Sequence, residues 1–251
     1  MEANVVDRIL LQVRELLEQN DVEGAIHLIE SLQPADQADV FEELPLEHQE
    51  ALLPRLDAED AADILEELED EEAAELASRM DTDTLAPIVD EMAPDEAADL
   101  LGDLDPSIST ITLARMKDAD EVKPLLLHPD QTAGGLMTSE YLAFPQNMRA
   151  GQALAAIRRW QPKGTESPYL FIVDREGHLV GTASIFQVLR ADPHQPLSAL
   201  MDREVIKVHV NDDQETAARL MAHYDLVAVP VVDDDDRLVG VITVDDLVEV
   251  L

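Results

Sequence analysis

The sequence contains no cysteine, few aromatic residues and no long apolar run. Without cysteine, disulfide bonds, thiolate-bound zinc and thiol catalysis are excluded, as is typical of proteins from a reducing compartment. Aromatic residues make up 3% of the 251 residues, so any core must consist of leucine, isoleucine, valine and alanine. No signal peptide is evident, and no apolar run approaches the ~20 residues that a membrane span needs. We therefore expect a soluble chain.

Basic side chains are also scarce, and the resulting charge is unevenly distributed. The chain has 55 acidic and 17 basic residues, a net charge of −38, which excludes unaided binding to nucleic acid or to an anionic membrane. Such a charge is consistent with cationic partners, with divalent metal ions or with a saline environment. Residues 1–131 hold 37 acids and 7 bases, whereas residues 132–251 hold 18 and 10. This difference predicts two domains.

The first half contains a twelve-residue repeat. Apolar residues recur at this interval from Leu32 to Met116, and a second series lies four residues earlier, from Leu28 to Leu100. One continuous helix would rotate such a stripe by ~120° per repeat, so the chain must break once in each unit. Prolines and capping aspartates supply the breaks at Pro34, Pro45, Pro54, Asp57, Asp81, Pro94, Asp105 and Pro106. We predict a helix over 5–17 and then short helices of about eight residues, stacked as a superhelix.

Acidic residues are densest on these predicted helices. Residues 57–72 include ten acids and no base. Such a face is either solvated or able to gather hard cations through carboxylates one helical turn apart, as at Glu59/Asp63 and Asp95/Asp99. A surface adapted to high salt would extend evenly into the second half, which it does not.

The second half contains a duplicated α/β module. Residues 171–181 match residues 230–240, and Leu136-Met137 matches Leu200-Met201. Each copy is predicted to run strand, helix, strand, strand, helix; in the second copy these are 205–210, 212–224, 228–232, 238–242 and 244–250. The pattern resembles a pair of CBS domains. The predicted fold class is thus multidomain α and α/β, with domains at 1–131, 132–199 and 200–251.

The CBS resemblance implies a nucleotide site. In that family a Ser/Thr and an Asp three residues later bind the phosphate and ribose of adenosine nucleotides, and here these are Thr243 and Asp246. Tyr169 is in a position to serve as the aromatic residue beside the base. The first copy has Ser184 but Gln187 in place of the aspartate, and Thr243 is equally consistent with a helix N-cap.

Both halves together resemble the cytosolic region of an MgtE-type magnesium channel. The junction Ala133-Gly-Gly-Leu-Met-Thr138, followed by Glu140-Tyr141, carries this resemblance together with Thr243-Val-Asp-Asp246. It implies a chain on the cytoplasmic side of the membrane in which bound Mg²⁺ stabilises a closed state. It also implies a homodimer formed through the CBS domains and a transmembrane pore domain absent from this chain, without membrane insertion by the fragment itself.

The same resemblance implies a set of magnesium ligands. They are Asp63, Asp95 and Asp99 in the first half and Gly135, through its carbonyl, Asp213, Glu215, Asp225, Asp246 and Glu249 in the second. An N-cap is the alternative role for Asp213, and solvation that for Asp63 and Asp99. No nucleophile–base arrangement stands out, so neither catalytic residues nor enzymatic activity is expected. The alternative functions are an ATP-sensing CBS module and a helical-repeat scaffold for protein partners.

Overall fold

The computed structural model describes residues 3–164 and 167–247, and the chain divides into two compact units. The first comprises 1–92 and 96–119, and the second comprises 93–95 and 120–251. The three residues 93–95 therefore group with the second unit although the chain on either side of them belongs to the first. None of the described helices is long and apolar enough to cross a membrane.

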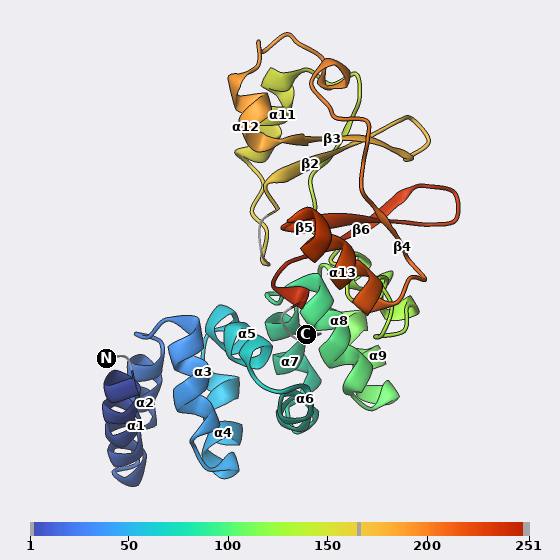
Figure 1. The fold of residues 1–251 in the computed structure, drawn as a ribbon. Coiled ribbons are helices and arrows are strands. Elements are labelled where there is room, and N and C mark those ends of the chain that lie inside the picture. Colours follow the sequence, from blue (N-terminus) through green and yellow to red (C-terminus); the bar gives the residue numbers. More distant parts are fainter. Residues whose placement is uncertain (1–2, 165–166, 248–251) are drawn as a thin grey trace. The chain divides into compact units, whose positions relative to one another are not determined.

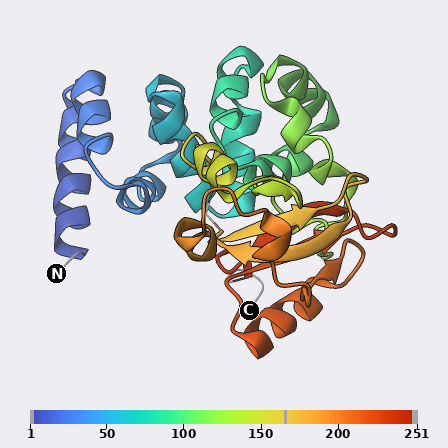
Figure 2. The ribbon, with the colours of Figure 1, turned by 90° about the horizontal axis from the view of Figure 1, so that it is seen from above.

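The first unit is a series of short helices. Figures 1 and 2 show successive helices of this unit side by side. After α1 (Ala3–Glu18) come α2 (Val22–Ile29), α3 (Pro34–Glu42), α4 (Leu46–Leu52), the 3₁₀ helix η1 (Leu53–Arg55), α5 (Ala58–Glu67), α6 (Asp70–Ser78), α7 (Thr82–Val89), α8 (Pro94–Asp103) and α9 (Pro106–Arg115). The stack of short helices predicted from the sequence is confirmed.

The helix boundaries lie where the breaking residues predict them. Pro34 and Pro106 occupy the first turn of α3 and α9, where a missing N–H costs nothing. The carboxylates of Asp57 and Asp105 accept hydrogen bonds from the first turns of α5 and α9. Asp81 is the N-cap of α7, without a side-chain hydrogen bond.

The two apolar series supply the core of the first unit. Val40, Leu52, Ile64, Leu76, Ile88 and Leu100 are buried on the helices. Most of the other series falls just beyond a helix end, where Leu44, Leu56, Leu68, Met92, Leu104 and Met116 are also buried. Helices of seven to ten residues are unstable alone in water, so this shared burial is what holds them in place.

The second unit contains the two copies of the α/β module, each with a three-stranded sheet. The chain enters through α10 (Ala119–Val122) and the 3₁₀ helix η2 (Leu125–Leu127). The first copy has β1 (Ala143–Pro145), α11 (Ala150–Ile157), β2 (Tyr169–Val173), β3 (Leu179–Ser184) and α12 (Ile185–Arg190), and the 3₁₀ helix η3 (Leu197–Ala199) follows. The second copy has β4 (Val208–His209), α13 (Gln214–Tyr224), β5 (Ala228–Val232) and β6 (Leu238–Thr243).

Both sheets have the same topology, as the duplication predicts. In each, the first strand pairs parallel with the second and the second pairs antiparallel with the third. The two hairpins lie side by side (Figure 1) and their turns are hydrogen-bonded, from the Leu179 N–H to the Asp236 carbonyl and from the Leu238 N–H to the Gly177 carbonyl. Phe171, Leu179, Val232 and Val241 belong to one core cluster to which both sheets contribute.

The Leu-Met segments of the duplication cross between the copies. Met137, from the start of the first copy, covers Gly240 of the second; a Cβ at Gly240 would lie 2.5 Å from its Cγ. Met201, from the start of the second copy, covers Gly181 of the first, where a Cβ would lie 2.7 Å from its Sδ. Each methionine therefore requires a glycine in the other copy's hairpin, because interiors at crystal-like density cannot absorb an added methyl group without displacement.

Candidate functional site

Asp95 and Asp246 form the most perturbed pair of acids among the described residues of the second unit. Asp95 lies in the first turn of α8, and Asp246 follows the end of β6. Burial and, to a lesser extent, the charge of Asp95 together raise the pKa of Asp246 to about 7. Burial likewise raises the pKa of Asp95, and the charges of Glu140 and Asp245 contribute in the same direction. The charge of Asp245 therefore acts on both Asp95 and Asp246, and that of Glu140 acts on Asp95.

The hydrogen bonds around this pair compensate only part of its charge. The backbone N–H and the hydroxyl of Thr243 donate to Asp246 Oδ2 at 2.7 and 3.0 Å. Thr138 hydrogen-bonds to Asp95, but Asp95 Oδ1 is enclosed and accepts no hydrogen bond. Among the described residues, none of the ion pairs involves Asp95, Asp245 or Asp246. An enclosed carboxylate oxygen without a donor is costly, and a cation is one partner that would satisfy it.

The segments that contain Gly135 and Asp213 are hydrogen-bonded to each other. Thr132 forms a β-bridge with Asp213, and the Gly134 N–H donates to the Val210 carbonyl. A Cβ at Gly135 would lie 2.7 Å from the Asp130 Cα, so the backbone of 129–130 leaves no room for a side chain there. The Asp213 carboxylate accepts from the Glu215 N–H at 2.9 Å, and Asp213 is the N-cap of α13. The alternative role of Asp213 as an N-cap is therefore present in the structure, and its role as a metal ligand stays a prediction.

The remaining predicted ligands are dispersed. Asp63 is half-buried on α5, where burial and the charges of Glu59 and Asp60 raise its pKa. Asp99 is exposed on α8, one turn after Asp95. Asp225 is exposed at the left-handed C-cap of α13, and Glu215 is exposed in its first turn. Glu249 lies outside the described residues.

The residues predicted to bind nucleotide have structural roles as well. The Thr243 hydroxyl lies within hydrogen-bond distance of the carboxylates of both Asp245 and Asp246, which share its one proton and order the turn after β6. Tyr169 is half-buried on β2 and packs against the cluster around Phe171 and Val241. In the first copy Ser184 and Gln187 form a reciprocal capping box, so glutamine there stabilises the start of α12.

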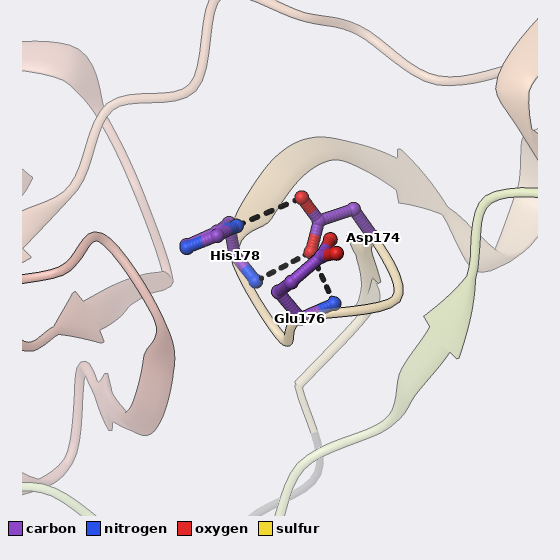
Figure 3. A group of neighbouring side chains, drawn as sticks. All are labelled: Asp174, Glu176 and His178. Atoms are coloured by element: carbon purple, nitrogen blue, oxygen red, sulfur yellow. Dashed lines mark hydrogen bonds and ion pairs between the residues drawn. The ribbon is translucent and has the colours of Figure 1, made fainter.

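Two features of the structure are not predicted by the sequence. Glu140 accepts hydrogen bonds from the Lys163 and Gly164 N–H groups, the shortest at 2.8 Å, while its charge acts on Asp95. Its loop partner is more than twenty residues away, so no local signal could have revealed this role. The other feature is the group of Asp174, Glu176 and His178 in the β2–β3 turn (Figure 3). In the sequence, polar residues at such a turn look the same as an ordinary solvated surface.

Within this hairpin group, the carboxylate of Asp174 is already hydrogen-bonded to its neighbours. Asp174 Oδ1 accepts from the Glu176 and His178 N–H groups at 2.9 Å each, and Oδ2 lies 2.8 Å from His178 Nδ1. These contacts, of which the bond with His178 is the strongest influence, lower the pKa of Asp174. Pro145, Asn147, Asp174, Arg175 and Ser198 are among the residues that line an adjoining cavity of about 260 Å³. Asp174 therefore functions as a turn-stabilising residue here.

Family profiles match both halves of the chain. The MgtE intracellular N domain matches over residues 12–64 and 32–131, and the CBS domain matches over residues 197–251. Among curated proteins, the magnesium transporter MgtE of Thermus thermophilus is 41% identical over 131 residues, which are 52% of this chain and 29% of that protein. MgtE of Bacillus subtilis is 29% identical over 247 residues, 98% of this chain and 55% of that protein. The chain thus spans about half or less of the length of these relatives.

Solved structures match nearly the whole chain. A crystal structure of the cytosolic domain of the Mg²⁺ channel MgtE in complex with ATP superposes with a TM-score of 0.89 at 34% identity, covering 96% of this chain and 100% of that one. The soluble part of a magnesium transporter superposes with a TM-score of 0.84 at 30% identity, covering 98% and 97%. Both halves of the sequence therefore have counterparts in a single known chain.

Proposed function

The chain belongs to the MgtE family of magnesium transporters, and we propose that it is the Mg²⁺-sensing regulatory region of such a transporter. In this role it lies on the cytoplasmic side of the membrane and controls a transmembrane pore domain of the same protein. Bound Mg²⁺ stabilises the closed state. Asp95 and Asp246 are the acids that we place at the centre of this response.

One observation carries the proposal: two mutually repelling, largely buried carboxylates with an enclosed oxygen that accepts no hydrogen bond. Oxygen ligands of this kind suit Mg²⁺, which binds one or two carboxylates and keeps several waters. The water shell also allows more distant acids to contribute, and for this reason we retain Asp63, Asp99, Gly135, Asp213, Glu215, Asp225 and Glu249 as ligands in the proposal.

The net charge of −38 supplies the opposing force. When Mg²⁺ is scarce, uncompensated carboxylates repel and favour an expanded state. When it is abundant, ions that bind acids of the N domain, the CBS domains and a second copy in a CBS-mediated homodimer favour a compact state. The ion shifts the equilibrium only by its greater affinity for the compact state.

The radius of gyration of the chain in Mg²⁺ and in Na⁺ at matched ionic strength tests this proposal. We expect a smaller radius in millimolar Mg²⁺, because selective binding and not general screening brings the acids together. An equal radius in the two salts would remove the sensing role. In that case, the helical repeat would be better explained as a scaffold for protein partners.

ATP is a second candidate ligand of the same chain. The likeness to an MgtE cytosolic domain crystallised with ATP favours it, as does the Thr243–Asp246 turn. We expect ATP to bind the chain in titration calorimetry and Thr243→Val to weaken this binding, because the hydroxyl is proposed to contact phosphate. Ser184→Val, at the matching position of the first copy, is the control and should bind as the unmodified chain does. Absence of saturable heat with the unmodified chain would exclude this ligand.

A further inference from the structure

A second group of acids, none of them among the predicted magnesium ligands, lies within the first unit. Glu30 is the C-cap of α2, Asp57 is the N-cap of α5, and Asp60 is in the first turn of α5. Each offers one carboxylate oxygen, and these three oxygens lie within 4.8 Å of one another. The only basic side chain in an ion pair with any of the three, among the described residues, is His27, 3.5 Å from Glu30 and 81% exposed.

A buried amide adjoins this group and is incompletely satisfied. The Gln37 residue on α3 is only 1% exposed. Its Nε2 donates to Asp60 Oδ1 at 2.7 Å and to the Leu32 carbonyl at 3.3 Å, so the amide is directed at the acids. Its Oε1 is buried and accepts no hydrogen bond. Covalent geometry sets Oε1 roughly 2.3 Å from Nε2, hence within about 5 Å of Asp60 Oδ1, a gap that one water molecule spans.

Two features of this group are unfavourable for the folded state. A buried acceptor without a donor is unfavourable, and interiors rarely leave one unpaired. Glu30 also places a negative charge at the C-terminal end of α2, where the helix dipole disfavours it. The charges of Asp57 and Asp60 extend to Asp63, whose pKa they help to raise. A cation with coordinated water would relieve all of these, because the ion neutralises the acids and its water donates to Oε1.

We propose that Glu30, Asp57 and Asp60 bind one hard divalent cation, with Gln37 Oε1 accepting a hydrogen bond from a water ligand of that ion. The all-oxygen donor set favours Mg²⁺, Mn²⁺ or Ca²⁺ over softer metals. The ion would connect α2, α3 and α5, and α3 already packs on α5. It would therefore fix the local geometry of the helical stack, independently of Asp95 and Asp246.

Anomalous diffraction from crystals of the full chain soaked in Mn²⁺ tests this site directly. We expect an anomalous peak in contact with the three carboxylates, which excess Mg²⁺ removes. Equilibrium dialysis should give one fewer bound Mn²⁺ per chain in the variant Glu30→Gln/Asp57→Asn/Asp60→Asn. Amides are chosen so that folding is preserved. Asparagine at position 57 remains a good N-cap, and the side-chain oxygen of asparagine at position 60 still accepts a hydrogen bond from Gln37.

The matched control is Asp70→Asn/Glu71→Gln/Glu72→Gln, which removes three charges from the first turn of α6. It should retain both the peak and the bound ion. A missing peak in the unmodified chain, or an equal loss of Mn²⁺ in the two triple variants, would overturn the proposal. The single variant Asp60→Asn carries the same expectation with one substitution, at the acid that accepts a hydrogen bond from Gln37.

Discussion

Replacing Asp246 with asparagine is expected to stabilise the metal-free chain at pH 8 and to remove its stabilisation by Mg²⁺. Burial and the charge of Asp95 raise the pKa of Asp246 from 3.8 to about 7 in the folded state. The folded chain therefore holds this proton more tightly than the unfolded chain does. Consequently the free energy of unfolding falls as the pH rises from about 4 to about 7, by up to about 4 kcal/mol.

Asparagine carries no charge at any of these pH values, so Asp246→Asn should recover this loss at pH 8. Its oxygen can still accept from Thr243, which preserves the turn. Mg²⁺ should stabilise the unmodified chain by preferential binding to the folded state and the variant far less. Urea unfolding at pH 5.5 and pH 8, with and without Mg²⁺, measures both effects. The exposed control Glu204→Gln should change neither. A variant less stable than the unmodified chain at pH 8 without Mg²⁺ would contradict this interpretation of Asp246.

Replacing Asp90 with alanine is expected to have the opposite effect, a large loss of stability that Mg²⁺ does not reverse. Asp90 is 5% exposed at the C-cap of α7. Its carboxylate accepts from the Lys117 N–H at 2.9 Å and from the Asp118 N–H at 3.1 Å. Alanine leaves two donors without this charged acceptor, which costs about 3 kcal/mol.

Urea unfolding of Asp90→Ala and Asp90→Asn measures this cost. Asparagine keeps one acceptor oxygen and should lose less than alanine. The stability gained on adding Mg²⁺ should be the same in both variants as in the unmodified chain, since Asp90 acts within the first unit. A loss below about 1 kcal/mol for alanine would show that these hydrogen bonds contribute little. The two sets of variants therefore distinguish Asp90, whose charge is compensated by backbone N–H groups, from Asp246, whose charge we propose is compensated by a bound cation.

The local parts of the fold were predictable from the sequence. Capping by Asp57 and Asp105 and breaks at Pro34 and Pro106 depend on residues within one helical turn, so the helix boundaries follow from the pattern. The duplicated hairpins were predictable for the same reason, because an apolar run and an acidic or glycine turn are short-range signals. The structure places β5 at Ala228–Val232, the range that the apolar run predicts.

The long-range contacts were not predictable in the same way. Met137 packs against Gly240, which is about a hundred residues away in the sequence. The duplication shows that the Leu-Met and Val-Gly pairs occur in each copy, but not that the methionine of one copy packs on the glycine of the other. The closeness of Asp95 to Asp246 could be expected only through the resemblance to MgtE. Gln37 breaks the apolar pattern of α3, and its burial beside Asp60 depends on how α3 packs on α5.

The most direct test of the sensing role is small-angle X-ray scattering of the unmodified chain and of Asp95→Asn/Asp246→Asn, each in millimolar Mg²⁺ and in Na⁺ of equal ionic strength. We expect Mg²⁺ to lower the radius of gyration of the unmodified chain and to change that of the double variant much less. The same radius for the unmodified chain in both salts, or an undiminished response in the double variant, would contradict it.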